Sequence, residues 1–275
     1  MKEIIESIWE GDYETFQSLL SATPEYAFMK DENGRTLLSW ASQVGDLRII
    51  RLLLEKGSDV NCADDNTMET PLDNAIIADK LEAALFLIAN GVDFSLKDIY
   101  GQATMHTLAN KKANGLWVDD WELVVVKLLD HGAKFDSVPI AAAFGTIQDV
   151  ANLVNAGHDV DEFLEGSDRT ALQIAAYCNN VEMVKYLVTR TGNINWTDFN
   201  QMTAVDIATD SEIEALLSDH GGESFNEIME FIRQGEQSVR AIQDFVCLVN
   251  SEKTPSLTSV AANQMDENRS TERIS

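Results

Sequence analysis

The residues that could do chemistry are few and lie far apart in the sequence. They are four histidines and three cysteines: His106, His131, His158, His220, Cys62, Cys178 and Cys247. Acid pairs occur at Asp64-Asp65 and Asp119-Asp120, but adjacent carboxylates in turns are typical of solvated helix caps rather than of metal or acid–base sites. Neither a Gly-rich phosphate loop nor a serine or cysteine nucleophile in an elbow is recognisable. We therefore expect no enzyme activity, no cofactor and no metal.

The charge of the chain limits its partners. The sequence contains 20 Lys and Arg against 46 Asp and Glu, which gives a formal net charge of −26. Such a field repels nucleic acid and anionic lipid and favours a protein partner with a basic surface. Residues 251–275 hold four acids and three bases and so contribute only −1. The acidity therefore belongs to residues 1–250, where we expect the folded part.

Cysteine usage and the N-terminal sequence indicate the compartment. Three distant cysteines without metal-ligand spacing favour a reducing environment over a disulfide framework. The first residues, MKEIIESIWEGDYETF, contain acids where a secretory signal has an uninterrupted apolar stretch, and no run of about 20 apolar residues occurs. We expect a cytoplasmic protein that does not span a membrane.

Two consecutive segments share one pattern: DENGRTLLSWASQVGDLRIIRLLLEKGSDVN from Asp31, and DNTMETPLDNAIIADKLEAALFLIANGVDFS from Asp65. Each has a threonine, a leucine two residues later, an alanine three residues after that, and a second apolar run that leads to a glycine. Threonine before an apolar run caps a helix N-terminus, and glycine suits a helix C-terminus that needs a positive φ. Each unit is therefore predicted to be a short helix, a longer helix and a polar turn. No unit can bury its apolar face alone, so the units must stack.

Further copies begin at Gly101 (GQATMHTLA), Thr170 (TALQIAA) and Thr203 (TAVDIA), and Thr70 opens the clearest copy, TPLDNA. These motifs resemble the ankyrin repeat, whose unit of about 33 residues carries a T-P-L-H-x-A motif. The resemblance covers residues 1–221 and implies an all-α solenoid of stacked helix–turn–helix units.

The pattern divides the chain into four parts. Residues 1–30 resemble a degenerate N-terminal capping repeat, and residues 31–221 hold the ankyrin repeats. Residues 222–250 keep helical periodicity without the repeat motif, which predicts a C-terminal helical cap. Residues 251–275 contain no aromatic side chain and are dominated by polar residues, so we expect a disordered tail.

The glycines that end the units reveal two irregularities. Gly57 and Gly91 are 34 residues apart, Gly91 and Gly132 are 41 apart, and Gly132 and Gly157 are 25 apart. Against a regular period of about 33, one unit has gained about eight residues and the next has lost about eight. The gain falls at about residues 111–120, where we predict a protruding loop. The loss falls in the turn that follows Gly132.

The resemblance to ankyrin-repeat proteins implies that the chain binds a protein through a concave face and the turn tips. Trp40 and Phe86 lie within the apolar helical pattern and are predicted core residues, whereas exposed aromatic residues in polar surroundings are typical of interfaces. Trp117 and Trp121 bracket the inserted loop and are either such anchors or local packing residues. The predicted partner-binding residues are Arg35, Gln43, Glu69, Ile77, Tyr100, Gln102, Trp117, Trp121, Asp161, Glu162, Arg169, Tyr177, Phe199 and Met202.

Three functions fit these observations. The favoured one is an interaction module that holds a partner with a basic surface. A narrower version is an inhibitor or immunity-type protein that neutralises a basic toxin or enzyme with acids such as Asp161 and Glu162. The third is that the repeats support an enzymatic activity or form a regulatory subunit of an enzyme. Its weak point is space, since only residues 222–275 lie outside the repeats, too few for a typical catalytic domain. In each case we expect a chain that is monomeric on its own.

Overall fold

The computed structural model describes residues 1–117 and 119–234. The chain divides into two compact units, Met1–Glu223 and Ser224–Ser275. The second unit begins with α15 (Phe225–Gln234), which lies within the predicted C-terminal cap. The rest of that cap and the predicted tail at residues 251–275 lie outside the described residues.

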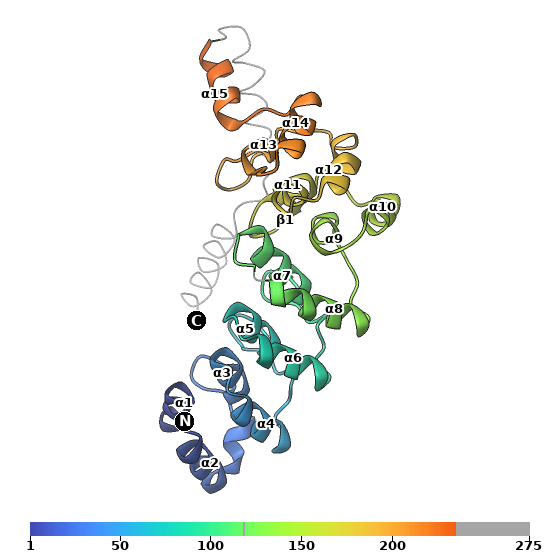
Figure 1. Cartoon of the computed structure of the whole chain (residues 1–275). Helices are drawn as coiled ribbons and strands as arrows, with labels where there is room; N and C mark the ends of the chain where they lie inside the picture. The colour runs from blue at the N-terminus through green and yellow to red at the C-terminus, as the bar shows by residue number, and fades with distance from the viewer. Residues whose placement is uncertain (118, 235–275) are drawn as a thin grey trace, which may run out of the picture. The chain divides into compact units, whose positions relative to one another are not determined.

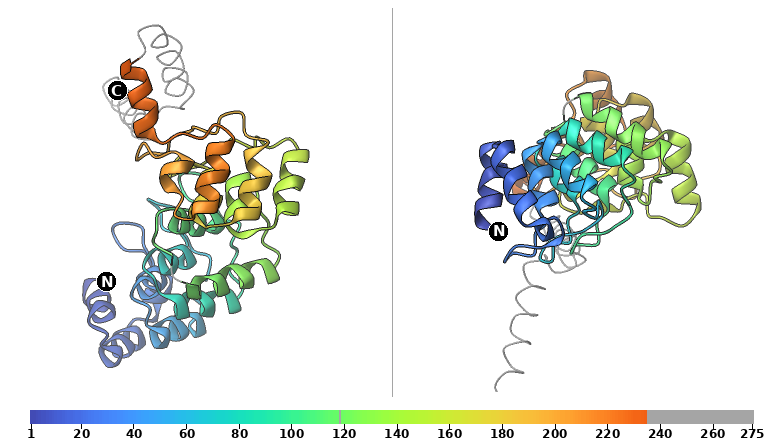
Figure 2. Two further views of the ribbon diagram at one scale, coloured as in Figure 1. Left: turned by 45° about the horizontal axis from the view of Figure 1, so that its top comes forward. Right: turned by 90° about the horizontal axis from the view of Figure 1, so that it is seen from below.

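The first unit is a stack of paired helices, as the repeats predicted, with inner and outer helices in two rows (Figure 1; Figure 2 gives two further views). The inner helices are α1 (Lys2–Glu10), α3 (Leu37–Val44), α5 (Pro71–Ile77), α7 (Thr104–Ala113), α9 (Val138–Phe144), α11 (Ala171–Tyr177) and α13 (Ala204–Ile207). The outer helices are α2 (Tyr13–Ala22), α4 (Leu47–Glu55), α6 (Leu81–Ala89), α8 (Glu122–Asp130), α10 (Ile147–Asn155), α12 (Val181–Val188) and α14 (Ser211–Asp219). The predicted all-α solenoid is thereby confirmed.

Short elements complete this unit. They are the 3-10 helices η1 (Pro24–Phe28) and η2 (Asp119–Trp121) and the strands β1 (Phe163–Leu164) and β2 (Arg169–Thr170). The two strands pair antiparallel, with Phe163 opposite Thr170. We use the name "fingers" for four long connections that each lead from an outer helix to the next inner helix. They span residues 56–70, 90–103, 156–170 and 189–203.

Local side-chain chemistry starts the inner helices where the repeat motif predicted. Thr70 is the N-cap of α5: its Oγ1 accepts a hydrogen bond from the backbone N–H of Asp73, whose carboxylate accepts one from the backbone N–H of Thr70. Thr170 and Thr203 form the same reciprocal capping box on α11 and α13. Such a cap contributes about 1 kcal/mol, so each repeat fixes its own helix start.

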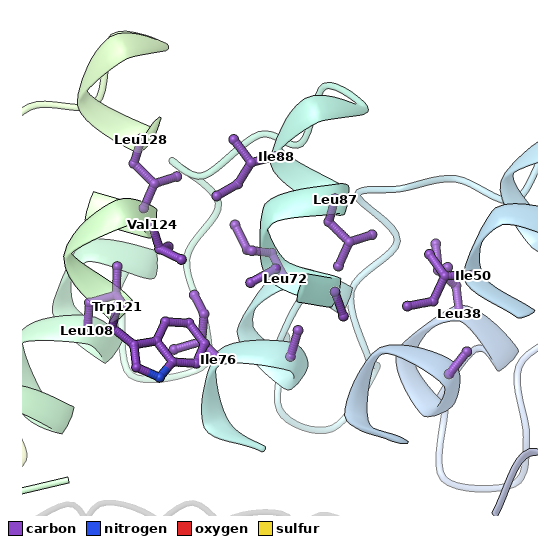
Figure 3. Close-up of a cluster of buried hydrophobic side chains, with 14 of the residues drawn as sticks. Leu38, Ile50, Leu72, Ile76, Leu87, Ile88, Leu108, Trp121, Val124 and Leu128 are labelled. Carbon is purple, nitrogen blue, oxygen red and sulfur yellow. The ribbon is translucent and has the colours of Figure 1, made fainter. Parts of the chain in front are cut away.

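The apolar faces of the helices interlock between units. Leu53 on α4 is fully buried, and Figure 3 shows Leu38, Leu72 and Leu108 from successive inner helices in one cluster with residues of α6 and α8. Trp40 and Phe86, the predicted core residues, are half-buried and pack against this cluster from its edge.

The core changes at α9. Ile140 and Ala143 belong to the cluster that begins at α1, whereas Val138, Ala141 and Ala142 belong to a second cluster with α11 to α14. The row of outer helices is interrupted at the same place. Helix α6 packs on α8, and α12 packs on α14, but α8 and α10 do not form a packed pair. The two halves of the stack are therefore joined mainly through their inner helices.

This change coincides with the predicted missing turn. Only residues 131–137 connect α8 to α9, whereas the neighbouring fingers span 90–103 and 156–170. Ser137 is the N-cap residue of α9, although its side chain makes no capping hydrogen bond. The sequence analysis thus identified the position at which a finger is absent.

The inserted segment differs from the predicted protruding loop. The gained residues lengthen α7 to Ala113 and then form η2. Ala113 is fully buried and Lys111 is 7% exposed, because the added helical turn packs against the core instead of projecting into solvent. The prediction of a loop at 111–120 was therefore wrong for residues 111–113, whereas Asn114, Gly115 and Leu116 are exposed and non-helical.

Candidate functional site

The fingers carry exposed apolar side chains at their tips. Phe199 is 79% exposed and Tyr100 is 50% exposed, so both are accessible as predicted. Met68 and Ile99 are exposed at neighbouring tips and were missed by the sequence analysis. We call Met68, Ile99, Tyr100 and Phe199 the finger tips.

The inner helices add a second set of accessible apolar residues. Ile77 is 53% exposed at the end of α5, and Tyr177 is 36% exposed at the end of α11. Leu116 is 63% exposed in the inserted segment and was not predicted. The added Cβ of an alanine at Gly115 would lie 2.9 Å from the Tyr177 hydroxyl, so the insert reaches Tyr177 across the face. These residues define the inner-helix face.

Arg35 holds neighbouring units together instead of standing free. Its guanidinium lies 3.1 Å from a carboxylate oxygen of Asp64, which belongs to the next finger and is itself buried. It also donates to the Gln43 side chain at 3.0 Å and to the side-chain Oδ1 of Asn74. The Trp40 ring lies under the guanidinium at 3.8 Å from its carbon. Arg35 and Gln43, predicted to bind a partner, are therefore engaged within the repeat stack.

Arg169 makes the equivalent arrangement further along the chain. Its Nε donates to Asp198 at 3.0 Å, and the two side chains are 8% and 1% exposed. The guanidinium also donates to the backbone carbonyl of Ala113 and lies 5.2 Å from the centre of the Tyr177 ring. The predicted role of Arg169 as an accessible partner-binding residue is contradicted by its burial. Its guanidinium is paired with Asp198 inside the repeat stack.

Trp121 was predicted to be either an interface anchor or a local packing residue, and the structure makes it a packing residue. It is 2% exposed and lies in the core beside Leu108 and Val124 (Figure 3). Its assignment as a partner-binding residue is wrong, since the lengthened α7 and α8 cover the ring. Trp117 is half-buried and packs on Phe144 of α9, with ring centres 5.2 Å apart. For Trp117, the alternative of local packing is the one that the contacts favour.

The predicted acids are half-buried and serve the connections around them. Both oxygens of Asp161 accept hydrogen bonds from the next finger, one from the Thr191 hydroxyl at 2.5 Å and one from the Gly192 N–H at 2.6 Å. Glu162 accepts from the backbone N–H of Val138 at the start of α9 and lies 3.6 Å from His158. The carboxylate oxygens of both residues therefore stabilise the stack through these hydrogen bonds. Only their negative charge remains for a long-range electrostatic interaction with a partner.

Glu69 sits in an acidic, partly desolvated setting. Burial raises the pKa of its carboxyl above the usual range, and the nearby carboxylates Asp64 and Asp73 raise it further. Burial likewise raises the pKa of Asp73, against the opposing hydrogen bonds from Thr70 and Thr104. Local negative charge is thus concentrated where a cationic side chain of a partner would relieve it.

The remaining predicted residues, Gln102 and Met202, are half-buried at the finger bases. Each donates its backbone N–H to an aspartate four residues earlier in the same finger, Asp98 at 2.9 Å and Asp198 at 3.0 Å. Their side chains lie between the finger tips and the inner helices, so they remain predicted contacts.

Chemistry-bearing clusters were sought across residues 1–117 and 119–234. In those ranges, no group of three or more His, Cys, Asp or Glu side chains is placed to hold a metal ion. In the same part of the chain, no helix is long and apolar enough to cross a membrane. Burial raises the pKa of the Cys62 and Cys178 thiols, which lowers their reactivity as nucleophiles.

Comparisons with known proteins agree with this architecture. Residues 4–98 and 139–227 match the family described as ankyrin repeats (3 copies), and the unmatched stretch contains both the insert and the short connection. The ankyrin repeat domain of human ASB11 has a similar fold, with a TM-score of 0.51 and 21% identity over 80% of this chain and 98% of that one.

Two curated relatives show how much of each protein is shared. An L-asparaginase of Dirofilaria immitis is 26% identical over 166 residues, which cover 60% of this chain and 28% of that protein. The chain thus spans little more than a quarter of that relative. The probable 26S proteasome regulatory subunit p28 of Saccharomyces cerevisiae is 25% identical over 218 residues, 74% of this chain and 92% of that one. The paired helices, the capping boxes and the matched residues together establish that this chain belongs to the ankyrin-repeat family.

Proposed function

We propose that this chain is a non-catalytic module that binds a partner protein with a basic surface through its finger tips and inner-helix face. The exposure of Phe199 and Tyr100 is the observation on which the proposal rests. Large aromatic side chains left in water at turn tips gain free energy when a partner covers them, and such residues are typical binding hot spots.

Charge supplies the specificity of the proposed interaction. The net charge of −26 raises the local concentration of a cationic protein and accelerates its encounter with the face. Glu69, whose carboxyl is held in an unfavourable acidic setting, gains from a lysine or arginine placed beside it. We further propose a cytoplasmic chain that is monomeric without its partner.

A regulatory subunit of a larger assembly is the second candidate. The similarity to the yeast regulatory subunit p28 extends over 92% of that protein, so this chain matches it as a whole rather than as one repeat segment among other domains. The inhibitor or immunity-type reading rests on charge alone, and it predicts loss of the partner's own activity on binding.

The experiment begins with capture of partners from the source cells on the immobilised full-length chain, with mass spectrometry to identify them. Binding kinetics are then measured by surface plasmon resonance for wild type, Tyr100→Ala and Phe199→Ala. We expect dissociation to become at least about tenfold faster in both variants, because each removes a hot-spot side chain. Leu123→Ala on the outer helix α8 is the matched control, since Leu123 is also an exposed apolar residue.

The electrostatic part is tested separately. Glu32 and Glu165 are exposed on the connections, so Glu32→Gln with Glu165→Gln should slow association without altering the fold. The control pair Glu55→Gln and Glu82→Gln removes the same charge from exposed positions on the outer helices α4 and α6. Salt should slow association as the screening length falls from about 10 Å at 0.1 M to about 3 Å at 1 M. A captured partner whose association ignores both salt and charge would contradict the basic-partner proposal.

A further inference from the structure

The absent finger leaves a hollow between residues 90–103 and the short connection 131–137. Its volume is about 290 Å³. Phe94 and Met105 form its apolar lining, and Lys97, Lys134 and Asp136 are the charged residues around it. This volume is at the lower limit for a small-molecule pocket, so it suits two or three side chains of a peptide better than a cofactor.

A buried polar group beside the hollow lacks the partner that its equivalent has elsewhere. The third residue of α11 is Gln173, whose Nε2 donates to the carbonyl oxygens of Trp196 at 2.9 Å and Met202 at 2.8 Å in the following finger. His106 is the third residue of α7, and the finger that would follow it is absent. Its buried Nδ1 makes no hydrogen bond and lies 3.9 Å from Asp136.

The other equivalents show that this position normally joins one unit to the next. Ser39 donates to Asp64 of the next finger at 2.7 Å, and Asp73 accepts from the Thr104 hydroxyl of the next unit at 2.9 Å. A second buried atom, the Oγ of Ser137, which follows the lining residue Asp136 in the chain, also has no hydrogen-bond partner. Buried polar groups left unpaired are unfavourable, and both of these adjoin residues that line the hollow where the finger is absent.

Two lysines give the hollow a charge opposite to that of the chain. Lys97 and Lys134 are exposed, and neither forms an ion pair with a carboxylate in the described part of the chain. Asp136 is the single acid among the lining residues. Within a protein of net charge −26, the lining of the hollow therefore carries one positive charge more than negative ones.

We propose that this hollow binds an extended segment of a partner protein that carries an aspartate or glutamate, laid where the missing finger would lie. The backbone of the segment lies against Met105 and Asp136, the lining residues next to His106 and Ser137 in the chain. Its carboxylate lies between Lys97 and Lys134, and apolar neighbours cover Phe94. This site is independent of the finger tips and has the opposite charge preference, so it goes beyond the function proposed above.

The chain itself contains the natural probe, because residues 193–202 (NINWTDFNQM) form a finger with one aspartate. A synthetic peptide of this sequence, acetylated and amidated, is titrated into the ¹⁵N-labelled full-length protein. We expect shifts confined to residues around 94–105 and 132–137, including the imidazole resonances of His106. A second peptide with asparagine in place of the aspartate should bind about three- to fivefold more weakly, as expected for a solvent-accessible ion pair.

Protein variants assign the effect to the lysines. Lys97→Ala and Lys134→Ala should each weaken binding of the aspartate peptide by about three- to fivefold and leave binding of the asparagine peptide nearly unchanged. Lys56→Ala, which removes an exposed lysine from the end of α4, should alter neither. The proposal is overturned if the peptide causes no shifts at millimolar concentration, if the shifts map elsewhere, or if the lysine variants bind both peptides like wild type. None of these measurements involves the basic partner, so their failure is separate from failure of the proposed function.

Discussion

Replacing Arg169 by methionine tests whether this residue stabilises the stack or serves the partner. The change keeps much of the side-chain length but removes the charge opposite Asp198, which is 1% exposed, and the donor to the Ala113 carbonyl. Breaking a buried pair by removing one partner costs about 3–5 kcal/mol, because the remaining charge is left buried without compensation. We expect a loss of stability of that size in urea denaturation followed by circular dichroism.

A double-mutant cycle separates the ion pair from other effects. Asp198→Asn keeps an oxygen for the backbone N–H groups of Asn200 and Met202, which donate to it at 2.8 Å and 3.0 Å. The two single changes should together cost about 2–3 kcal/mol more than the double change, as expected for residues in direct contact. The pair Lys127 and Asp130, 3.7 Å apart and exposed, is the control and should couple by less than about 1 kcal/mol.

The opposite result would restore the role predicted from sequence. If Arg169→Met costs less than about 0.5 kcal/mol and the two single changes are additive, the guanidinium is not held in a desolvated pair. Arg169 would then be available to a partner, and loss of partner binding without loss of stability would be its expected phenotype.

Three further changes probe the core and the buried carboxyl. Leu53→Ala should cost about 2–5 kcal/mol in denaturation experiments, whereas the exposed Leu123→Ala should stay within about 0.5 kcal/mol; equal effects would mean that the helix register is wrong. Trp121→Ala should cost about 3–5 kcal/mol, and replacing residues 112–119 by a short turn should lower the melting temperature; an unchanged melting temperature would return the insert to the surface. Because the folded-state pKa of Asp73 is raised, its contribution to the free energy of unfolding is most favourable below about pH 3.8 and is lost as pH rises through the raised value. The variant Asp73→Asn should lack this decline, and parallel plots of stability against pH for the variant and wild type would refute the assignment.

The sequence predicted the helix starts well because they depend on adjacent residues. Thr70 caps α5 through Asp73, three positions away, and the same local rule acts at Thr170 and Thr203. Repeat spacing also located the absent finger after Gly132, since a deletion shifts every later motif by a fixed number of residues.

The two arginines show what single positions did not reveal. Arg35 and Asp64 are 29 residues apart, and so are Arg169 and Asp198, because in each case the aspartate belongs to the next finger. Each arginine directly precedes the threonine that caps an inner helix, so in isolation it resembled a charged residue on the surface of a turn. The recurring separation of 29 residues was the signal that would have indicated an internal ion pair.

The insert could not be placed from sequence, because its contacts lie far along the chain. The Asn110 side chain donates to the backbone carbonyl of Glu165, 55 residues later, at 2.7 Å. Lys112 donates to the carbonyl of Ala143 near the end of α9, and Trp117 packs on Phe144. Length and composition indicated a polar loop, whereas long-range packing made residues 111–113 an extension of α7 and left only the segment after Ala113 outside the helix.

The insert at residues 111–120 therefore compensates for the short connection 131–137 on the inner-helix side of the stack only. The lengthened α7 spans α9 along the inner-helix face and contacts the next finger at Glu165, so it supplies contacts between units that the absent finger does not. On the finger side nothing in the described residues fills the space, and the hollow remains between residues 90–103 and 131–137. The insert also interrupts the inner-helix face, because Gly115 approaches Tyr177 while Leu116 stays exposed. If a partner lies along this face from Ile77 to Tyr177, as proposed, we therefore expect it to contact the exposed Leu116 of the insert as well.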